Sequence, residues 1–199
     1  MICIIPARGG SQRIPNKNIR DFHGKPIIAY SIEIAKESKL FDRIIVSTDS
    51  DTIGAVALVY GAEVHERPPW LATDEIGTQE VVGAVLEDLG VDDTTDVCAL
   101  YATCPLLPVG HLKDGAWVLR RYHSSIRRAE ISCVYSVDPE GEPTGGFYFA
   151  PAWYFKEGLD PYVDGLGIYA DDIDINTFED WKRAEKLYEE RHGHASNMA

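Results

Sequence analysis

Short apolar runs alternate with helix-like stretches along the first half of this chain, and this alternation constrains its fold more than any other feature. Ile2–Ala7 is apolar, rich in β-branched residues and followed by Gly9-Gly10, which is typical of a strand buried on both faces. A helix is expected from Pro26 to about Leu40, because apolar residues recur there at helical spacing. The alternation continues with expected strands at Arg43–Ser47, Ala62–His65 and Asp96–Ala102 and expected helices at Asp51–Tyr60 and Gln79–Leu89.

This βαβαβαβ order predicts an α/β fold with a mostly parallel sheet, helices on both faces and ligands at the carboxyl ends of the strands. The second half is less regular. A chain of 199 residues with 45% hydrophobic residues is of ordinary size and composition for one domain with its own core. In the second half we expect helices at Leu112–Tyr122 and Thr177–Glu190 and strands at Ile131–Val137 and Gly146–Ala150.

Charge and hydropathy exclude several classes of function. The formal net charge of -13 argues against general nucleic-acid binding, which needs a basic face, so any anion site must be local. No apolar run approaches the roughly 20 residues of a spanning helix, so we expect no membrane association and a cytoplasmic location. The four cysteines lie far apart, without zinc-ligand spacing.

A basic loop follows the first expected strand. Its cations are Arg8, Arg13, Lys17, Arg20 and Lys25. The loop has neither the Walker A pattern nor the G-x-G-x-x-G pattern, yet consecutive glycines directly after a strand let backbone N–H groups approach an anion closely. The sequence therefore predicts a phosphate site, and the alternative interpretation is a glycine turn that carries surface cations.

An acidic segment, Asp171–Asn176, lies near the other end of the chain. On an extended strand, Asp172, Asp174 and Asn176 would face one side, and such oxygen ligands suit Mg²⁺. The alternative is a strand edge in which Asn176 or Thr177 caps the final helix, and both can be true. If this segment and the basic loop meet at one sheet edge, they form a site for a metal-bound triphosphate.

Seven blocks of sequence follow one another along the chain: IIPARGGSQRIPNKNI, GKPIIAYSIE, FDRIIVSTDSDTI, YGAEVHERPPWLATDEIGT, YATCPLL, GGFYF and DIDINTFEDWKRAE. In their order and setting they resemble the CMP-sialic acid synthetase family of cytidylyltransferases. Within them, YATCPL and GFY are more similar to the pseudaminic acid branch than to the acylneuraminate branch. The resemblance implies a Rossmann-like fold of the nucleotide-diphospho-sugar transferase type and an enzyme that joins CTP to a nine-carbon 2-keto sugar acid, with pseudaminic acid expected, and releases pyrophosphate.

The same resemblance implies roles for individual residues. Arg8 and Lys17 are expected on the phosphates and, with Asp174, in catalysis, while Asp174 and Asn176 are expected to hold Mg²⁺. Arg67 before two prolines could instead pin a loop, and Thr103 could simply end a strand. The expected nucleotide-binding residues are Ala7, Arg8, Gly9, Gly10, Ser11, Arg13, Lys17, Asn18, Arg67, Asp74 and Thr78, and the expected sugar-binding residues are Ala102, Thr103, Phe147 and Tyr148.

Three departures from the family pattern temper this interpretation. Gln12 stands where a lysine is usual, and Asn176 stands where many members have a second acid. Only Asp138–Thr144 replaces the long excursion that helps build the family's dimer and closes over the sugar, so the dimer is expected to be weakened or absent. We therefore expect a cytidylyltransferase domain over residues 1–190 with a shortened segment near 138–144, followed by a flexible tail at 191–199. The alternatives are a nucleotide-binding relative with impaired catalysis and a cytidylyltransferase for N-acetylneuraminate or another 2-keto sugar acid.

Overall fold

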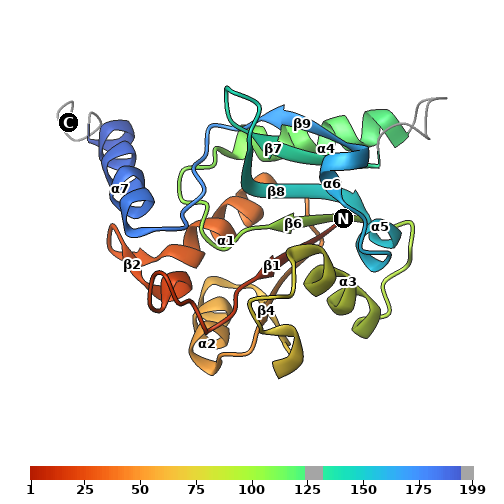
Figure 1. The fold of residues 1–199 in the computed structure, drawn as a ribbon, viewed down its shortest axis with the longest axis horizontal. Coiled ribbons are helices and arrows are strands. Elements are labelled where there is room, and N and C mark those ends of the chain that lie inside the picture. Colours follow the sequence, from red (N-terminus) through yellow and green to blue (C-terminus); the bar gives the residue numbers. More distant parts are fainter. Residues whose placement is uncertain (124–131, 194–199) are drawn as a thin grey trace.

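A seven-stranded sheet forms the centre of the protein in a computed structural model that describes residues 1–123 and 132–193 (Figure 1). Its strands are β1 (Ile2–Pro6), β4 (Arg43–Thr48), β5 (Glu63–Glu66), β6 (Asp96–Leu100), β7 (Cys133–Val137), β8 (Pro143–Pro151) and β9 (Gly165–Tyr169). They lie in the order β5-β4-β1-β6-β8-β7-β9. Only β8 is antiparallel to its neighbours among these described strands, which confirms the mostly parallel sheet expected from the sequence.

Helices cover both faces of the sheet because the side chains of each strand alternate between them. In β1, Cys3 and Ile5 join the apolar cluster on one face, while Ile2 and Ile4 join the cluster on the other. The first cluster includes residues of α1 (Ile27–Ser38), α2 (Asp51–Tyr60) and α4 (Val109–His123). The second includes residues of α3 (Thr78–Asp88) and α5 (Ala152–Lys156).

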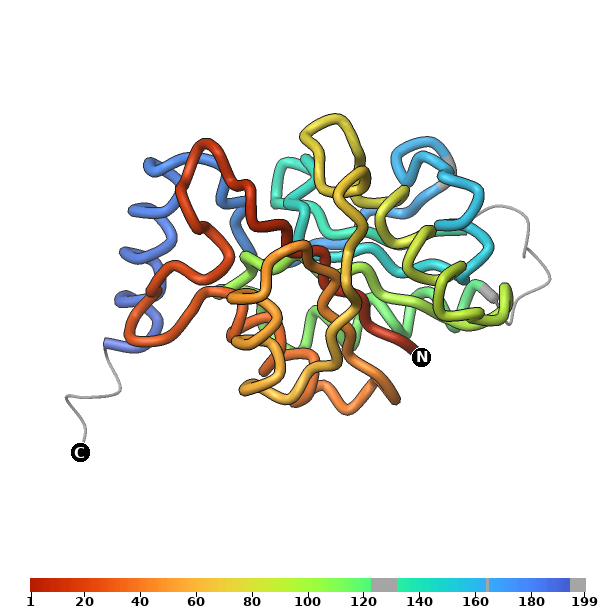
Figure 2. The backbone as a smooth tube through the Cα atoms, turned by 90° about the horizontal axis from the view of Figure 1, so that it is seen from below, coloured from red at the N-terminus to blue at the C-terminus, as the bar shows by residue number. Residues whose placement is uncertain are grey.

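A third apolar cluster joins the two ends of the chain. The opening segment, with the 3₁₀ helix η1 (Lys17–Ile19) and the small hairpin of β2 (Asp21–Phe22) and β3 (Lys25–Pro26), lies beside α7 (Phe178–His192) in both ribbon and tube views (Figures 1 and 2). The Phe22 ring makes edge contacts with Trp181 of α7 and with Tyr30 of α1, each with centroids 5.5 Å apart. The basic loop is thereby held against the C-terminal helix.

Most elements expected from the sequence are present, with shifts of a few residues at their ends. The sequence reasoning missed β9, the short helices α5 and α6 (Pro161–Asp164) and the 3₁₀ helix η2 (Pro69–Leu71). β9 pairs in parallel with β7, with Cys133 opposite Gly165. The expected strand Ile131–Val137 is found as β7, and its first residue lies outside the described ranges.

The prediction of an extended strand at Asp171–Asn176 is wrong. β9 ends at Tyr169, and the following residues pair with no strand of the described sheet. Instead, Ile173 and Ile175 are buried in the cluster beneath α7. The segment leaves the sheet because its apolar side chains find their burial against the C-terminal helix and the opening loop.

The last helix begins and ends with defined polar contacts. Thr177 caps α7, since its side chain accepts a hydrogen bond from the backbone N–H of Asp180, and the Asp180 carboxylate accepts one from the backbone N–H of Thr177. Near the other end, Arg191 donates to the Leu106 carbonyl at 2.9 Å and to Asp171 Oδ1 at 2.7 Å. The expected tail at 191–199 therefore starts within the helix, and residues 194–199 lie outside the described part of the chain.

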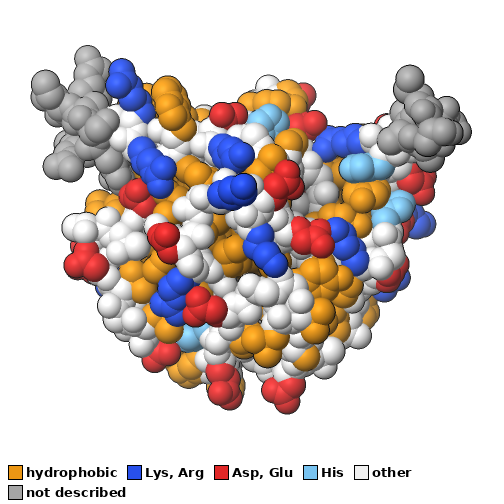
Figure 3. Space-filling model, turned by 180° about the vertical axis from the view of Figure 1, so that it is seen from behind, with side chains coloured by type: hydrophobic (Ala, Val, Ile, Leu, Met, Phe, Trp, Pro, Cys, Tyr) orange, Lys and Arg blue, Asp and Glu red, His pale blue; other side chains and the backbone are white. Residues whose placement is uncertain are grey.

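The back of the molecule shows Lys and Arg side chains mixed with Asp and Glu (Figure 3). Within residues 1–123 and 132–193, no helix combines the length and the apolar character needed to cross a bilayer.

Candidate functional site

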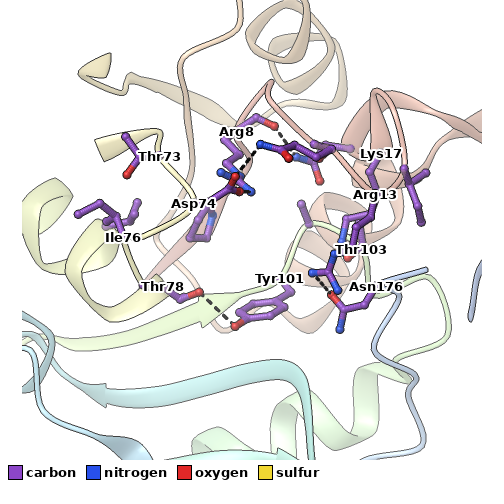
Figure 4. Close-up of a pocket in the computed structure, with 18 of the residues that line it drawn as sticks. Arg8, Arg13, Lys17, Thr73, Asp74, Ile76, Thr78, Tyr101, Thr103 and Asn176 are labelled. Carbon is purple, nitrogen blue, oxygen red and sulfur yellow. Dashed lines mark hydrogen bonds and ion pairs between the residues drawn. The ribbon is translucent and has the colours of Figure 1, made fainter. Parts of the chain in front are cut away.

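A pocket of about 460 Å³ opens at the carboxyl ends of β1 and β6, where ligands bind in open α/β sheets (Figure 4). Four segments that lie far apart in the sequence line it. They are the opening loop from Arg8 to Asn18, the stretch from Arg67 to Thr78, the end of β6 from Tyr101 to Thr103, and Asn176 before α7.

The opening loop is held in place by backbone contacts. The backbone N–H of Gly9 donates to Asp49 Oδ1 at 2.8 Å, and Asn18 Nδ2 donates to the Arg8 carbonyl at 2.9 Å. A Cβ atom at Gly9 would lie 3.1 Å from the Ser50 Cβ, whereas one at Gly10 would meet nothing within 4 Å. The loop thus packs closely at Gly9 and leaves open space at Gly10, where an anion can approach the backbone.

The cations of the loop reach two acidic segments. Arg8 Nη2 forms an ion pair with Asp74 Oδ1, and Gln12 Nε2 donates to Asp74 Oδ2 at 2.7 Å. On the other side, Lys17 Nζ donates to the Ile175 carbonyl at 2.7 Å and Arg13 Nη2 donates to Asn176 Oδ1 at 3.3 Å. The structure therefore brings the basic loop and the acidic segment together, as the sequence suggested.

Lys17 and Asp174 influence each other's protonation at the buried end of this contact. Burial lowers the pKa of Lys17, and the nearby Asp174 charge partly opposes that shift. Burial also raises the pKa of Asp174, with the Asn176 hydrogen bond and the Lys17 charge acting in the opposite direction. Each group thus favours the charged form of the other in a poorly solvated place.

Arg67 enters the pocket from the end of β5. It is 4% exposed, its Nη2 donates to the Ser47 carbonyl at 2.7 Å and its Nε donates to Ser47 Oγ at 3.3 Å. Burial lowers its pKa to about 10, so the guanidinium remains charged at neutral pH. Thr78, at the start of α3, also lines the pocket, and its Oγ1 donates to the Tyr101 hydroxyl at 3.1 Å.

The expected sugar-binding residues separate into three places. Ala102 and Thr103 are buried and line the pocket. Phe147 is fully buried in the cluster on the α1 and α4 face, where a Cβ at Gly115 would touch its ring, so the structure assigns Phe147 to the core. Tyr148 faces the other side of the sheet beside Tyr101, with ring centroids 6.0 Å apart.

A tyrosine that lines the pocket and a second one that bonds to Tyr148 escaped the sequence reasoning. Tyr101 lines the pocket, and its position at the carboxyl end of a predicted strand was the signal that could have identified it. The hydroxyl of Tyr162, which lies in α6, is 2.7 Å from the Tyr148 hydroxyl. No local pattern points to Tyr162, because a four-residue helix leaves no periodicity to read.

The residues expected to hold a metal ion are close together. Asn176 Nδ2 donates to Asp174 Oδ2 at 2.5 Å. Both carboxylate oxygens of Asp172 are buried without a hydrogen-bond partner among the described residues, and burial raises the pKa of Asp172 to about 7. The described residues contain no group of three His, Cys, Asp or Glu side chains arranged as a metal centre. The oxygen-only donors and the unpaired carboxylate fit a hard cation such as Mg²⁺ that takes its remaining ligands from substrate and water.

Glycines let the acidic segment lie directly against the start of β8. A Cβ at Gly145 would be 2.9 Å from the Tyr101 ring and 3.7 Å from the Asp174 carboxyl carbon. One at Gly146 would be 3.0 Å from Asp172 Oδ2. A larger residue at Gly146 would crowd the Asp172 carboxylate, and one at Gly145 would displace the Tyr101 ring.

A tight turn joins β7 and β8 at the short segment 138–144 noted in the sequence. The backbone N–H groups of Glu140 and Glu142 both donate to Asp138 Oδ1, at 3.0 and 2.8 Å. Gly141 has φ 90°, which glycine adopts without strain. This turn offers no segment long enough to fold over the pocket.

Comparison with known proteins identifies relatives along most of the chain. A family model described as cytidylyltransferase matches residues 2–139. A pseudaminic acid cytidylyltransferase of Campylobacter jejuni is 35% identical over 225 aligned positions, which cover 96% of this chain and 97% of the relative. An N-acylneuraminate cytidylyltransferase of Oncorhynchus mykiss is 33% identical, covering 92% of this chain and 49% of the relative. The alignment with the Campylobacter protein is longer than this chain, so that relative carries residues absent here.

Solved structures agree with the fold. A CMP:2-keto-3-deoxy-manno-octonic acid synthetase complexed with CTP superposes with a TM-score of 0.72 at 14% identity, covering 96% of this chain and 98% of that one. A 4-diphosphocytidyl-2C-methyl-D-erythritol synthase gives a TM-score of 0.66 at 14% identity, covering 94% and 98%. At such low identity these likenesses establish the fold alone.

Proposed function

Because this chain belongs to the cytidylyltransferase family, we propose that it transfers CMP from CTP to a nine-carbon, sialic-acid-like 2-keto sugar acid and releases pyrophosphate. It is a nucleotidyltransferase. The observation that carries the proposal is the convergence of Arg8, Arg13 and Lys17 on one pocket beside Asp174 and Asn176. Arg13 lies within hydrogen-bond distance of Asn176, and the charges of Lys17 and Arg13 both act on Asp174.

Pseudaminic acid is the proposed acceptor. The support is the similarity to a pseudaminic acid cytidylyltransferase over nearly the full length of both proteins. Because other relatives are named for N-acylneuraminate, that acid and other 2-keto sugar acids are alternative acceptors for the same reaction.

The opening loop is proposed to bind the triphosphate. Arg8, Arg13 and Lys17 neutralise its charge, and the backbone N–H of Gly10 donates to a phosphate oxygen. The N–H groups of Ala7, Gly9 and Ser11 hold the loop in shape through bonds to Ser47, Asp49 and the Gly9 carbonyl, and Asn18 does so through the Arg8 carbonyl. Arg8 is paired with Asp74 before the nucleotide binds, so a phosphate oxygen must take the place of that carboxylate.

The segment from Arg67 to Thr78 is proposed to receive the cytidine. Arg67 offers a buried, charged guanidinium there, and Thr78 offers a hydroxyl at the start of α3. The sugar acid is assigned to the part of the pocket lined by Ala102 and Thr103, with the Tyr148 ring beside Tyr101. Phe147 supports this space from the core without contacting the ligand.

Mg²⁺ would be held by Asp174 and Asn176. When bound, it supplies positive charge that neutralises phosphate oxygens and activates the phosphorus centre. Lys17 anchors the segment by its bond to the Ile175 carbonyl, and Arg13 orients the Asn176 amide. These contacts hold the oxygen ligands beside the phosphate-binding loop.

The reaction is an in-line displacement at the α-phosphorus. The anomeric hydroxyl oxygen of the sugar acid forms the new bond to phosphorus, and the bond to the pyrophosphate oxygen breaks. Arg8 and Lys17 neutralise charge that develops on the phosphate oxygens, so positioning and electrostatics supply most of the rate enhancement. No histidine lines the pocket among the described residues, so the hydroxyl proton is given to the leaving pyrophosphate or to water.

One cytidylyltransferase domain is proposed over residues 1–190, in the cytoplasm. The short Asp138–Glu142 turn leaves no excursion to cross to a second copy, so the proposed protein forms a weaker dimer than its relatives or none. Neither a nucleic acid nor a membrane is proposed as a partner.

Isothermal titration with CTP and Mg²⁺, combined with a pyrophosphate-release assay over a panel of sugar acids, tests the proposal. Turnover of pseudaminic acid with a kcat/KM well above that of the other acids is expected. Binding of CTP without turnover of any acid would favour the alternative of a nucleotide-binding relative with impaired catalysis. That alternative is supported by Gln12, which offers Asp74 a neutral amide, and by Asn176, which brings no charge.

A further inference from the structure

A series of hydrogen bonds links Arg67 to further polar side chains, most of them buried, that lie away from the pocket. Ser47 in β4 and His65 in β5 are direct neighbours in the parallel register of these strands. Ser47 Oγ lies 3.1 Å from His65 Nδ1 and 3.3 Å from Arg67 Nε. His65 Nε2 lies 3.2 Å from Asp88 Oδ2, at the end of α3.

Burial makes each of these contacts matter. Ser47 is 0%, Arg67 4% and His65 7% exposed, whereas the Asp88 side chain is 73% exposed. A buried polar group that loses its partner costs more free energy than a surface group, because water cannot replace the partner. Of the four linked side chains, Asp88 alone is freely hydrated.

The donors and acceptors fit one direction along the chain. Arg67 Nε–H donates to Ser47 Oγ, the Ser47 hydroxyl donates to His65 Nδ1, and His65 Nε2–H donates to Asp88. This direction places a proton on Nε2 and leaves Nδ1 as an acceptor. Every polar hydrogen and acceptor in the sequence of contacts is then used once.

The order of Ser, His and Asp resembles a hydrolase triad, but the burial excludes that chemistry. Ser47 has no exposed surface, so no substrate carbonyl can reach its oxygen. That oxygen also accepts from a charged guanidinium, which makes it a poorer nucleophile. The series of hydrogen bonds ends on Arg67, so its chemical role is its effect on that side chain.

Arg67 needs support because it is a buried cation. Burial is the largest cause of its lowered pKa; the negative charge of Asp49 opposes that shift, and the positive charge of Arg8 adds a smaller lowering effect. Its Nε and Nη2 are both turned to Ser47, and Nη1 has no hydrogen-bond partner among the described residues. The guanidinium is therefore fixed on the side of Nε and Nη2. Its Nη1 donors remain free beside the pocket, which Arg67 lines.

We propose that Ser47 and His65 are positioning residues that hold the Arg67 guanidinium in the orientation that binds the nucleotide. The inference rests on the proposed function, in which Arg67 contacts the cytidine nucleotide. An arginine held in advance binds without first losing the freedom of its side chain. These hydrogen bonds therefore contribute to nucleotide binding, and they leave the chemical step at the α-phosphorus unchanged.

Three variants separate this role from a merely structural one. Ser47→Ala and His65→Leu remove a link, whereas His65→Asn keeps an acceptor oxygen near the place of Nδ1. Ser38→Ala is the matched control, because Ser38 is also a buried serine, bonds to the Ala35 carbonyl in α1 and is not among the residues that line the pocket. Folding of each variant is checked by its thermal melt.

Calorimetry and steady-state kinetics are expected to divide the variants. Ser47→Ala and His65→Leu should raise the Kd and the KM for CTP about tenfold, with kcat and the KM for the sugar acid within about twofold of wild type. His65→Asn and Ser38→Ala should stay within about threefold of wild type in all four quantities. Equal loss of kcat and both KM values in folded His65→Leu protein would overturn the proposal, and so would an unchanged Kd.

Nitrogen-15 spectra of the arginine Nε–H groups give a readout that requires no nucleotide. The Arg67 signal, assigned by its absence in Arg67→Lys, should exchange slowly with water in the wild type and in His65→Asn, and at least tenfold faster in His65→Leu. Equal exchange rates in the wild type and His65→Leu would overturn the positioning role. A wild-type protein that binds no CTP but shows this difference in exchange would instead refute the proposed function.

Discussion

Arg8 and Asp74 form an ion pair across the mouth of the pocket, although 66 positions separate them in the sequence. The same carboxylate accepts a hydrogen bond from Gln12, so Asp74 binds two side chains of the loop that is expected to bind phosphate. An anionic ligand and Asp74 must compete for Arg8, and this competition has a measurable consequence.

Replacement of Asp74 by Asn should release Arg8. We expect Asp74→Asn to lower the Kd for CTP about threefold to tenfold, because the neutral amide competes less well with phosphate for a guanidinium. Calorimetry with CTP at low and moderate salt measures the effect, which should shrink as salt rises. A higher Kd in the variant would instead indicate that Asp74 itself contacts the nucleotide.

Loss of a loop cation should weaken the use of CTP. Arg8→Ala and Lys17→Ala should each lower kcat/KM for CTP about tenfold to a hundredfold, since charge-assisted hydrogen bonds contribute about 1.5 to 3 kcal/mol. Lys25→Ala is the matched control, because Lys25 belongs to the same basic segment but pairs with Glu33 of α1. Unchanged kinetics in both loop variants would remove the loop from the site.

Asp174 should decide the dependence on Mg²⁺. Asp174→Asn leaves two neutral side chains at the proposed metal position, and a strongly hydrated dication is poorly held by neutral oxygens alone. We expect at least a hundredfold loss of Mg²⁺-dependent pyrophosphate release. Asp171→Asn, which removes an acid of the same segment that pairs with Arg191, should lose less than threefold. Near-normal Mg²⁺ dependence of Asp174→Asn would contradict the assignment.

The thiols should be inert in the folded protein. All four cysteines are buried, and burial raises the pKa of Cys133 to about 12 and the pKa of Cys98 and Cys104 well above the usual value. A disulfide reagent at pH 8 should label none of them within minutes, and all four after denaturation. Because the folded chain keeps thiol protons that the unfolded chain releases, the free energy of unfolding should also fall as the pH rises above about 9. Rapid labelling before denaturation would contradict this prediction.

Assembly should reflect the short turn between β7 and β8. The turn that begins at Asp138 closes within a few residues on its own backbone hydrogen bonds. We expect light scattering at micromolar concentration to give the mass of a monomer, 22.1 kDa. A stable dimer at that concentration would show that another surface has taken over the interface.

The sequence predicted those parts of the fold that depend on local pattern. β1, β4 and β6 are short apolar runs bounded by turn residues, and each was placed to within two residues. β9 escaped because Gly165–Tyr169 holds two glycines and lies half-buried at the sheet edge, so neither composition nor alternation marks it. Asp171–Asn176 alternates like a strand, but alternation cannot say whether a partner strand is there to pair with it.

The part of the candidate site in which glycines and cations are close together in the sequence could be predicted. The contacts between segments that are distant in the sequence could not. The basic loop was identified from its own sequence, since Gly9-Gly10 after a strand is a local signal. The pairing of Asp74 with Arg8 and the support of Arg67 by Ser47 depend on how distant strands come together. Phe147 was misplaced because neighbouring strand residues face opposite sides, and the motif does not tell which side carries the ligand.

The attachment of the opening loop to the C-terminal helix also fixes the order in which the molecule can be completed. The four neighbouring strands β5, β4, β1 and β6 all lie before residue 101, so they can pair while the rest of the chain is still being synthesised. The bond from Lys17 to the Ile175 carbonyl spans 158 positions and must wait for nearly the whole chain. A nascent chain can thus hold half of its sheet while its pocket still lacks one wall, and only the finished protein is ready to bind.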